Sequence, residues 1–414
     1  MKSKNVISLF AGAGGMDLGF KKAGFNIIWA NDFEKDAVMT YKNNIGDHIV
    51  YGDITKIDIK NELPNEEEID LVIGGFPCQG FSVNNIKRNM EDKRNFLYLE
   101  LLKVIELKKP KFFVAENVKG LLSMEKGKVI DMIVKDFENL GYKVDYQLLN
   151  AADYGVPQAR ERVIIIGNRI GVKNPFPVIS HVAPDDNLSF FDYKSDKELK
   201  THITVEEAIG FLADTEIQNG KVNDYIRVND RKIYNHVAST KVEDKFFGRK
   251  YPVNQHDICD YLRFYRDKSE WTTKKIDEHF GYKHTAGHWF RKDNNSGSIP
   301  KPKDWWELKK ILKFDNKYDK VVTTFVEKDI KFEQSLRITN WDRPSDTITA
   351  TMPEIHVNKT RRLSARECAI LQTFPDDFVF YGALNSLHRQ IGNAVPVLLA
   401  EKIGLEISKV IDIN

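Results

Sequence analysis

A buried strand that ends in two glycines and a cysteine-bearing turn is the feature that most constrains this chain. Residues 69–73 are apolar enough to form an interior strand, and Gly74 and Gly75 interrupt it before a tight Pro-Cys turn at Cys78. Open α/β sheets place their ligands at the carboxyl ends of parallel strands. The pattern therefore predicts an α/β sheet with Cys78 at its functional edge.

Two interpretations of Cys78 are open at this point. A single cysteine in a globular chain is most often a small buried hydrophobe. A core cysteine, however, belongs mid-strand among Val and Ile, whereas Cys78 follows Pro77 and precedes the polar residues Gln79 and Ser82. This setting favours a reactive thiol, which makes Cys78 a candidate nucleophile.

A glycine-rich turn after the first apolar strand predicts a cofactor without phosphates. Residues 6–10 form the predicted strand, and the turn containing Gly12 and Gly14 leads to a helix-like segment at 21–24. Such a turn lets backbone N–H groups approach a ligand. A dinucleotide fingerprint would need glycine three residues after Gly14, but that residue is Asp17. S-adenosylmethionine fits this departure, and an ordinary tight turn is the alternative.

Acidic residues follow the second and third predicted strands. Asp32 lies 20 residues beyond Gly12, the spacing at which an acid reaches ribose hydroxyls in doubly wound folds. Its alternative role is to cap the helix predicted over residues 34–42. Phe33 either stacks on adenine or packs in the core. Asp53, at the end of the next short strand, is placed to accept a hydrogen bond from the adenine amino group.

Charged residues also follow later strands. The strand predicted over residues 112–115 ends at Glu116, which is a candidate acid because it lies one strand from Cys78. Arg160 and Arg162 stand at alternate positions ahead of a further strand, so their side chains point to one face of an extended segment. Guanidinium groups placed in this way can donate paired hydrogen bonds to a carbonyl or a phosphate. Surface salt bridging is the alternative for both arginines.

These motifs resemble, in content and order, those of the DNA (cytosine-5)-methyltransferases of bacterial restriction-modification type. The resemblance covers residues 5–167 and 343–396. It rests on the glycine turn, Phe-Pro-Cys-Gln-Gly-Phe-Ser (76–82), Glu-Asn-Val (116–118), Gln-x-Arg-x-Arg (158–162) and Gln-x-Gly-Asn (390–393). It implies an α/β fold in which a doubly wound, Rossmann-like S-adenosylmethionine-dependent methyltransferase domain carries a second, smaller target-recognition domain.

The resemblance also implies a chemistry. Cys78 would add to carbon 6 of a cytosine flipped out of duplex DNA, so that carbon 5 can take a methyl group. Glu116 would protonate ring nitrogen 3, while Arg160 and Arg162 would hold the base carbonyl and a nearby phosphate. Cofactor contacts are expected from Phe10, Ala13, Gly14, Gly15, Asp32, Phe33, Asp53, Ile54, Pro77, Leu97, Asn393 and Ala394. DNA contacts are expected from Gln79, Ser82, Lys87, Arg88 and Arg94, in a polar stretch that suits a lid.

Three segments are expected along the chain. They are a catalytic and cofactor-binding domain (1–180), a small target-recognition domain (181–385) with a helix-rich basic insert at about 254–320, and a C-terminal helix returning to the first domain (386–414). Residues 231–320 hold 21 Lys and Arg against 13 Asp and Glu, in a chain of net charge +2. This asymmetry predicts a polyanion-binding segment.

The insert contains two predicted helices, at residues 255–266 and 271–280, whose purpose the sequence leaves open. They either read a major groove in the manner of a helix-turn-helix or supply an aromatic core to the small domain. Further along, Ser364 with Glu367 predicts a capping box at a helix start. A last helix is predicted over residues 397–411, and the resemblance implies that it closes the cofactor pocket.

Composition limits the classes of protein that this chain can join. With 414 residues, 42% of them apolar and 29% charged, it suits a globular protein of two or three domains. No apolar run is long enough for a signal peptide or a membrane helix, which favours the cytoplasm. Three widely spaced cysteines are expected to be reduced thiols without a metal site. Double-stranded DNA and a cognate restriction endonuclease encoded nearby are the expected partners, the membrane is not, and the enzyme is expected to be a monomer.

Three other functions are weaker alternatives. A tRNA cytosine-5 methyltransferase would share the fold, but it would not need the large basic insert. A binding protein without turnover is disfavoured because every reactive position is present. A thiol hydrolase is disfavoured because no histidine lies near Cys78 in the chain.

Overall fold

The computed structural model describes residues 4–64, 69–77, 97–184, 199–218, 224–240, 255–282, 289–290, 300, 302–323, 337–351 and 353–412. The chain divides into two compact units. Unit 1 comprises Met1–Val237, Asn340–Thr351 and Ser364–Asn414, and unit 2 comprises Ala238–Thr339 and Met352–Leu363. All described residues of the predicted active site belong to unit 1.

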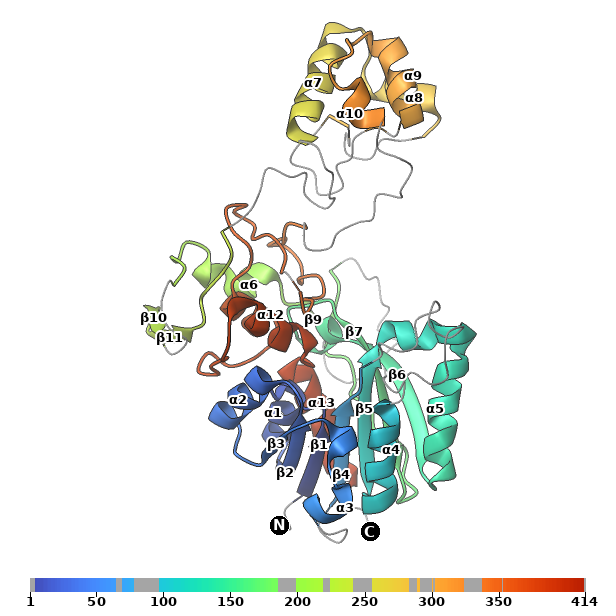
Figure 1. Cartoon of the computed structure of the whole chain (residues 1–414), viewed down its shortest axis with the longest axis vertical. Coiled ribbons are helices and arrows are strands. Elements are labelled where there is room, and N and C mark those ends of the chain that lie inside the picture. The colour runs from blue at the N-terminus through green and yellow to red at the C-terminus, as the bar shows by residue number, and fades with distance from the viewer. Residues whose placement is uncertain are drawn as a thin grey trace. The chain divides into compact units, whose positions relative to one another are not determined.

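Unit 1 is built on a seven-stranded sheet with the strand order β3-β2-β1-β4-β5-β7-β6 (Figure 1). The strands are β1 (Lys4–Leu9), β2 (Phe25–Asp32), β3 (Ile49–Tyr51), β4 (Leu71–Gly75), β5 (Phe112–Val118), β6 (Lys143–Asn150) and β7 (Glu161–Asn168). The first five strands in this order are mutually parallel, and β7 is antiparallel to both β5 and β6. The order reverses between β1 and β4, so their carboxyl ends flank the topological switch point.

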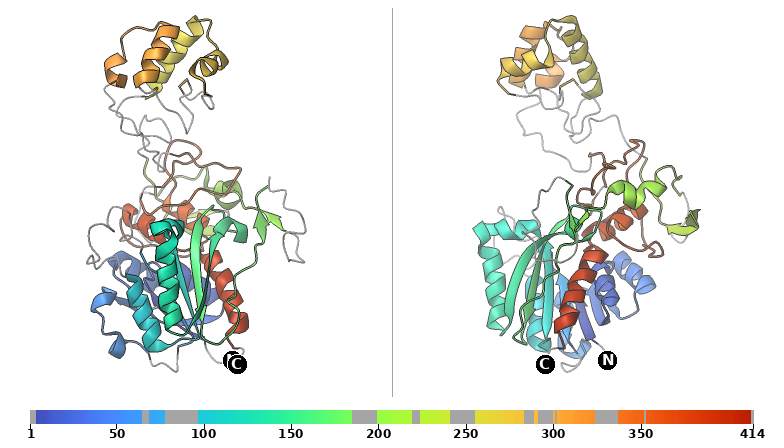
Figure 2. Two further views of the ribbon diagram at one scale, coloured as in Figure 1. Left: turned by 90° about the vertical axis from the view of Figure 1, so that its right-hand side faces the viewer. Right: turned by 180° about the vertical axis from the view of Figure 1, so that it is seen from behind.

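Helices cover both faces of the sheet (Figures 1 and 2). α1 (Gly15–Lys22), α2 (Lys35–Asn44) and α13 (Val397–Val410) lie on one face, and α4 (Leu97–Lys108) and α5 (Lys128–Asn139) on the other, with the short α3 (Ile59–Glu62) between β3 and β4. α13 packs closely on α1 because Gly19 leaves room for it: a Cβ atom there would lie 2.5 Å from the Cβ of Ala400. The C-terminal helix therefore rests on the first helix of the chain.

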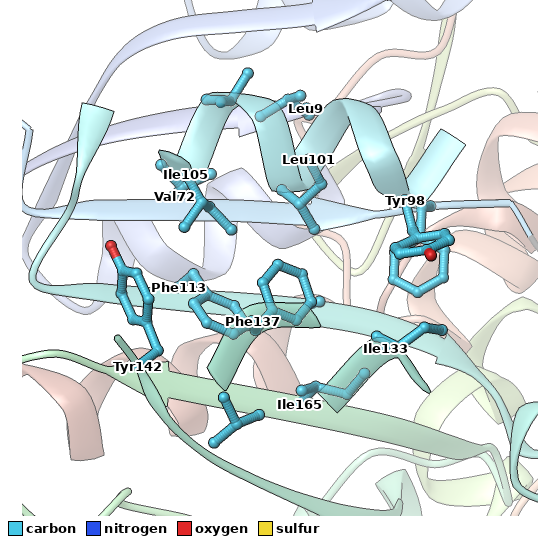
Figure 3. Packing of buried hydrophobic residues seen from close by; sticks show 14 of the residues in the cluster. Leu9, Val72, Tyr98, Leu101, Ile105, Phe113, Ile133, Phe137, Tyr142 and Ile165 are labelled. Atoms are coloured by element: carbon cyan, nitrogen blue, oxygen red, sulfur yellow. The ribbon is translucent and has the colours of Figure 1, made fainter. Parts of the chain in front are cut away.

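The sheet and the helices α4 and α5 enclose a large hydrophobic core (Figure 3). At its centre the ring of Phe113 lies 4.3 Å from that of Phe137 and 5.3 Å from that of Tyr142, measured between centroids. Gly167, paired with Phe113 in the sheet, leaves the space for this ring, since a Cβ atom there would lie 2.0 Å from Phe113 Cε1. Burying each such side chain contributes about 2 to 3 kcal/mol.

The rest of unit 1 consists of short elements. They are β8 (His181–Val182) paired with β9 (Lys200–Thr201), the hairpin β10 (Tyr225–Val228) and β11 (Arg231–Tyr234), and the helices α6 (Val205–Ile209), α11 (Ala365–Leu371) and α12 (Leu384–Asn393). The predicted capping box is confirmed at the start of α11, where Ser364 Oγ accepts from Glu367 N and Glu367 Oε2 accepts from Ser364 N.

Unit 2 contains a cluster of four helices with an aromatic core. The helices are α7 (Gln255–Lys268), α8 (Thr273–Phe280), α9 (Pro302–Leu312) and α10 (Asp319–Thr323). Trp289 and Trp305 are buried at its centre, and Trp305 Nε1 donates to Asp319 Oδ1 over 2.8 Å. The aromatic-core interpretation is therefore confirmed for these tryptophans, whereas Phe264 and Trp306 are exposed.

Candidate active site

The predicted nucleophile directly follows a short turn at the end of β4. The described residues stop at Pro77, two residues beyond the end of the strand at Gly75, and resume at Leu97. Cys78 therefore lies outside the described residues, as do the predicted DNA contacts Gln79, Ser82, Lys87, Arg88 and Arg94. Because β4 lies between β1 and β5, the described part of this turn stands at the switch point of the sheet.

Glu116 and Arg162 form an ion pair beside the end of β4. Arg162 Nε lies 2.7 Å from Glu116 Oε1, with the two side chains only 11% and 10% exposed. The sheet register pairs Glu116 with Gly75, and a Cβ atom on Gly75 would lie 3.0 Å from Glu116 Oε2. The Glu116 carboxyl group thus lies against backbone only three residues before Cys78.

Asn117, to which the sequence analysis gave no role, holds the turn that precedes Cys78. Its buried side chain donates from Nδ2 to the carbonyl oxygen of Phe76 over 2.9 Å. β5 therefore both supplies the Glu116 carboxyl group and fixes the backbone at the end of β4. The only signal in the sequence was its position in the middle of the Glu-Asn-Val motif.

Arg160 has different surroundings from Arg162, although only one residue separates them. Its guanidinium donates to the carbonyl oxygens of Ile348 (3.0 Å) and Gly392 (2.9 Å), and the residue is 1% exposed. Burial lowers the pKa of Arg160 well below its ordinary value, and the nearby Arg162 adds to this shift. The side chain joins three segments of unit 1 and does not reach the surface at which Arg162 meets Glu116.

The segment before Arg160 is paired with a distant part of unit 1. Ala159 N donates to Ser345 O over 2.8 Å, and Ser345 N donates to Pro157 O over 3.0 Å. Gln158 is fully buried, and its Oε1 accepts from Ile348 N over 3.0 Å. The Gln-x-Arg-x-Arg motif is therefore held by residues 345–348, which belong to the second stretch covered by the family resemblance (343–396).

The predicted cofactor residues cluster at the carboxyl ends of β1, β2 and β3. Asp32, at the end of β2, accepts from Gly12 N and from Glu34 N, each over 2.8 Å. Asp32 is 7% exposed, and burial raises its pKa. Phe10 and Gly12 both have positive φ angles, of 56° and 55°, so the turn is held in a left-handed form that is costly for phenylalanine.

The neighbouring aromatic and acidic residues are exposed. Phe33 is 60% exposed directly beside the buried Asp32. Asp53 follows β3, where its Oδ1 accepts from Thr55 N (3.1 Å) and Thr55 Oγ1 (2.8 Å), and Ile54 next to it is buried. Because β1, β2 and β3 are parallel neighbours, these residues share one edge of the sheet.

The last helices bring two further predicted residues to the glycine turn. A Cβ atom on Gly15 would lie 2.6 Å from Val395 O and 3.0 Å from Ala394 Cβ. Gly15 therefore packs directly against the backbone that carries Ala394 and the exposed Asn393. Of the other predicted cofactor residues, Ala13 and Gly14 are buried in the same turn, Pro77 follows β4 and Leu97 begins α4.

A buried chain of hydrogen bonds beneath the glycine turn was not expected from the sequence. Asp17, which is fully buried in α1, accepts from Ser8 Oγ on β1 and from the Tyr41 hydroxyl on α2, each over 2.9 Å. The same hydroxyl lies 2.9 Å from His48 Nε2. The Tyr41 ring also underlies Gly14, where a Cβ atom would lie 2.9 Å from Tyr41 Cδ2. These hydrogen bonds thus join β1, α1, α2 and the residue directly before β3.

Burial shifts the pKa values of two residues in this series of hydrogen bonds. It raises the pKa of Asp17 to about 6, despite the bonds from Ser8 and Tyr41, which act in the opposite direction. Burial also lowers the pKa of His48, and Lys21 lowers it further.

The basic insert divides into described helices and segments outside them. The helical residues 255–282 and 302–320 hold 11 Lys and Arg against 10 Asp and Glu. Residues 241–254 and 283–301 hold eight against three. Most of these residues, 283–288 among them, lie outside the described part of the chain. Groove reading by the helices therefore stays a prediction.

Neither a metal site nor a membrane span is found in the described part of the chain. No group of three or more His, Cys, Asp or Glu residues is arranged there to hold a metal ion. None of the helices described above combines the length and the apolar character needed to cross a bilayer.

Comparison with known proteins gives a consistent family. The family model for the C-5 cytosine-specific DNA methylase matches residues 4–409. The type II methyltransferase M.NgoFVII of Neisseria gonorrhoeae is 32% identical over 395 residues, which cover 94% of this chain and 83% of that protein. The type II methyltransferase M1.HphI of Haemophilus parahaemolyticus is 33% identical over 413 residues, covering 98% and 87%.

Solved structures share the fold. A crystal structure described as a candidate DNA modification methyltransferase from an E. coli prophage has a TM-score of 0.59 at 23% identity, covering 98% of this chain and 99% of that one. S. pombe Dnmt2 has a TM-score of 0.52 at 15% identity, covering 98% and 99%. The family match extends over nearly the whole sequence, and the chain therefore belongs to the C-5 cytosine-specific DNA methylases.

Proposed function

We propose that this DNA (cytosine-5)-methyltransferase acts on a cytosine flipped out of duplex DNA, with Cys78 as nucleophile and S-adenosylmethionine as methyl donor. The observation that carries the proposal is the Glu116–Arg162 pair, which lies against Gly75 at the switch point, three residues before Cys78. The nucleophile just after β4, the acid in β5 and the cation at the start of the antiparallel β7 thereby come from three adjacent strands, at the edge where α/β sheets bind ligands.

The donor set at β1, β2 and β3 suits S-adenosylmethionine. Asp32 uses one lone pair on each oxygen for backbone N–H groups, so further acceptor sites are available for ribose hydroxyls. The exposed ring of Phe33 offers a surface for adenine. A phosphate-bearing cofactor would favour a lysine or an arginine in this turn, but residues 10–15 contain neither. When bound, the cofactor supplies an electrophilic methyl group.

The protein residues make carbon 5 of cytosine reactive. The Cys78 thiolate forms a bond to carbon 6, and the displaced electron pair makes carbon 5 enamine-like while ring nitrogen 3 takes a proton from Glu116. Arg162 faces the same base and can donate to its carbonyl oxygen. Once carbon 5 carries the methyl group, water takes the carbon 5 proton, the released electron pair expels the Cys78 thiolate from carbon 6, and ring nitrogen 3 returns its proton to Glu116.

Arg160 is proposed as a positioning residue. Its two hydrogen bonds tie the strand that carries Arg162 to Gly392, which directly precedes the predicted cofactor residues Asn393 and Ala394. It would therefore act on the base and the cofactor only through these neighbours.

The biological setting is also a proposal. The relatives named above are type II methyltransferases, which supports a role as the modification half of a restriction-modification system with a companion endonuclease. We propose that unit 2, with the basic segments around its helices, contributes to target recognition, and that the enzyme acts as a monomer.

Bisulfite sequencing of a plasmid from cells that express the protein tests the proposal. We expect methylated cytosine within one short motif, and no methylation with the Cys78→Ala or Cys78→Ser variant. A duplex containing 5-fluorocytosine should trap Cys78 covalently, detected as a crosslinked peptide by mass spectrometry. Methylation that persists in Cys78→Ala would remove this residue from the mechanism. A parallel assay on tRNA separates the DNA enzyme from a tRNA methyltransferase.

A further inference from the structure

An exposed face of the β10–β11 hairpin carries cations that the proposed active site does not use. The antiparallel register pairs Tyr225 with Tyr234 and Arg227 with Lys232. Side chains alternate between the two faces of a strand, so these four residues share one face, while Ile233 lies on the other. The hairpin is close to α6 in unit 1 (Figure 2).

The opposite face of the hairpin is firmly anchored in unit 1. Ile233 is fully buried, and Arg231 forms an ion pair with Asp376 at 2.6 Å while its guanidinium carbon lies 4.1 Å from the Phe211 ring centroid. The buried Arg366 donates from Nε to Tyr234 O over 2.7 Å. These contacts anchor one face of the hairpin to unit 1, and Tyr225, Arg227 and Lys232 on the outer face are exposed.

The outer face concentrates positive charge on an aromatic base. Arg227 and Lys232 are both exposed and directly opposed, an arrangement that is destabilising unless an anion lies nearby. The Arg227 guanidinium carbon and Lys232 Nζ lie 5.9 Å and 5.0 Å from the Tyr225 ring centroid. Within the described part of the chain neither cation pairs with a carboxylate, in contrast to Arg231.

We propose that the face formed by Tyr225, Arg227, Lys232 and Tyr234 binds the phosphate backbone of the DNA on which the enzyme acts. The inference rests on the proposed function, because that function brings a polyanion to unit 1. Two cations side by side on a rigid β-ribbon match neighbouring phosphates. Unit 1, which carries this face, has 37 Lys and Arg against 43 Asp and Glu, so a local cationic face is needed to offset repulsion.

The salt dependence of DNA binding tests the proposal. We expect the double variant Arg227→Gln with Lys232→Gln, in the full-length protein, to lower the slope of log affinity against log salt by about 2 for a labelled mixed-sequence duplex. Each phosphate contact contributes about 0.9 to that slope. The single variants should each lower it by about 1, whereas Arg227→Lys should keep the wild-type slope because it keeps the charge.

A matched control separates this contact from a general loss of charge. Lys135 on α5 and Lys143 on β6 are exposed cations without a described ion pair, so Lys135→Gln with Lys143→Gln makes the same change in net charge. We expect the control to keep the wild-type slope. An equal fall in the slope for the control, or an unchanged slope for the hairpin variant, would overturn the proposal. An acidic protein would then be the alternative partner for this face.

A methylation assay distinguishes this failure from failure of the proposed function. If the wild-type protein transfers no methyl group to duplex DNA, the proposed function is wrong. If it does transfer methyl groups while the hairpin variants bind DNA with the wild-type slope, only the inference about the hairpin is wrong. Equal Tm values for wild type and variants exclude misfolding as the cause of any change.

Discussion

The two halves of the sheet hold their buried acids in different ways. On the catalytic side of the switch point, Glu116 faces a cation, Arg162, at 2.7 Å. On the cofactor side, among the described residues, Asp32 accepts from backbone N–H groups and Asp17 accepts from two hydroxyl groups. The difference fits our proposal, in which the catalytic half exchanges protons with a ligand and the cofactor half keeps the glycine turn in one shape.

Glu116→Gln should have the largest effect, and it tests whether the two halves are separable. The amide cannot deliver a proton to ring nitrogen 3, so the rate of methyl transfer in a single turnover should fall by about 10² to 10⁴. Cofactor affinity, measured by titration calorimetry, should stay within about threefold of wild type. Glu106→Gln, an exposed site on α4, is the matched control. A parallel loss of cofactor binding would contradict the division.

Arg160→Lys and Arg162→Lys form the second test. A lysine at position 160 cannot span both Ile348 O and Gly392 O, so at least one buried carbonyl loses its donor, and the free energy of unfolding should fall by about 2 kcal/mol. Arg162→Lys keeps a cation beside Glu116, so it should slow methyl transfer with little change in stability. Urea unfolding and single-turnover assays measure both effects. The reverse pattern would make Arg160 the residue that contacts substrate.

Asp32→Asn should weaken the cofactor half alone. The amide is a poorer acceptor for ribose hydroxyls, so the KM for the cofactor should rise about tenfold while kcat at saturating cofactor stays near wild type. Glu34→Gln is the control, because Glu34 lies two residues further along and its carboxylate pairs with Arg389 at 2.9 Å. A fall in kcat with unchanged KM would place Asp32 in the chemical step.

The sequence placed the strand ends approximately, because these motifs are local. The strand predicted to end at Ile73 continues to Gly75, and the helix predicted at residues 397–411 is α13 (Val397–Val410). α1 was expected only from residue 21, since glycine has a low helix propensity, but it begins at Gly15. The antiparallel direction of β7 was not predicted, because an apolar run carries no direction.

Partners that lie far along the chain could not be predicted. Arg160 bonds to residues 188 and 232 positions away, and nothing in Gln-x-Arg-x-Arg separates it from Arg162. Asp17 was interpreted only as a departure from a dinucleotide fingerprint. Its real surroundings depend on Ser8, Tyr41 and His48, which meet only after the sheet has formed.

Replacing Asp17 should give the smallest effect, and it tests whether the buried hydrogen bonds keep the glycine turn in one shape. Burial raises the pKa of Asp17 from 3.8 to about 6, so the folded protein binds this proton more tightly than the unfolded chain. The contribution of Asp17 therefore favours folding at low pH and is lost as the pH rises through 6. Between pH 5 and pH 7 the loss should be on the order of 1 kcal/mol.

Asp17→Asn removes this proton equilibrium while keeping the shape of the side chain. The wild-type free energy of unfolding minus that of the variant should therefore fall by on the order of 1 kcal/mol from pH 5 to pH 7, as measured by urea unfolding. Asp131→Asn, at an exposed site on α5, controls for the change in net charge. Parallel pH profiles for wild type and Asp17→Asn would mean that water or another donor solvates this carboxylate. The glycine turn would then owe its shape to the packing of Tyr41 against Gly14, and the contrast between the two halves of the sheet would rest on Asp32 alone.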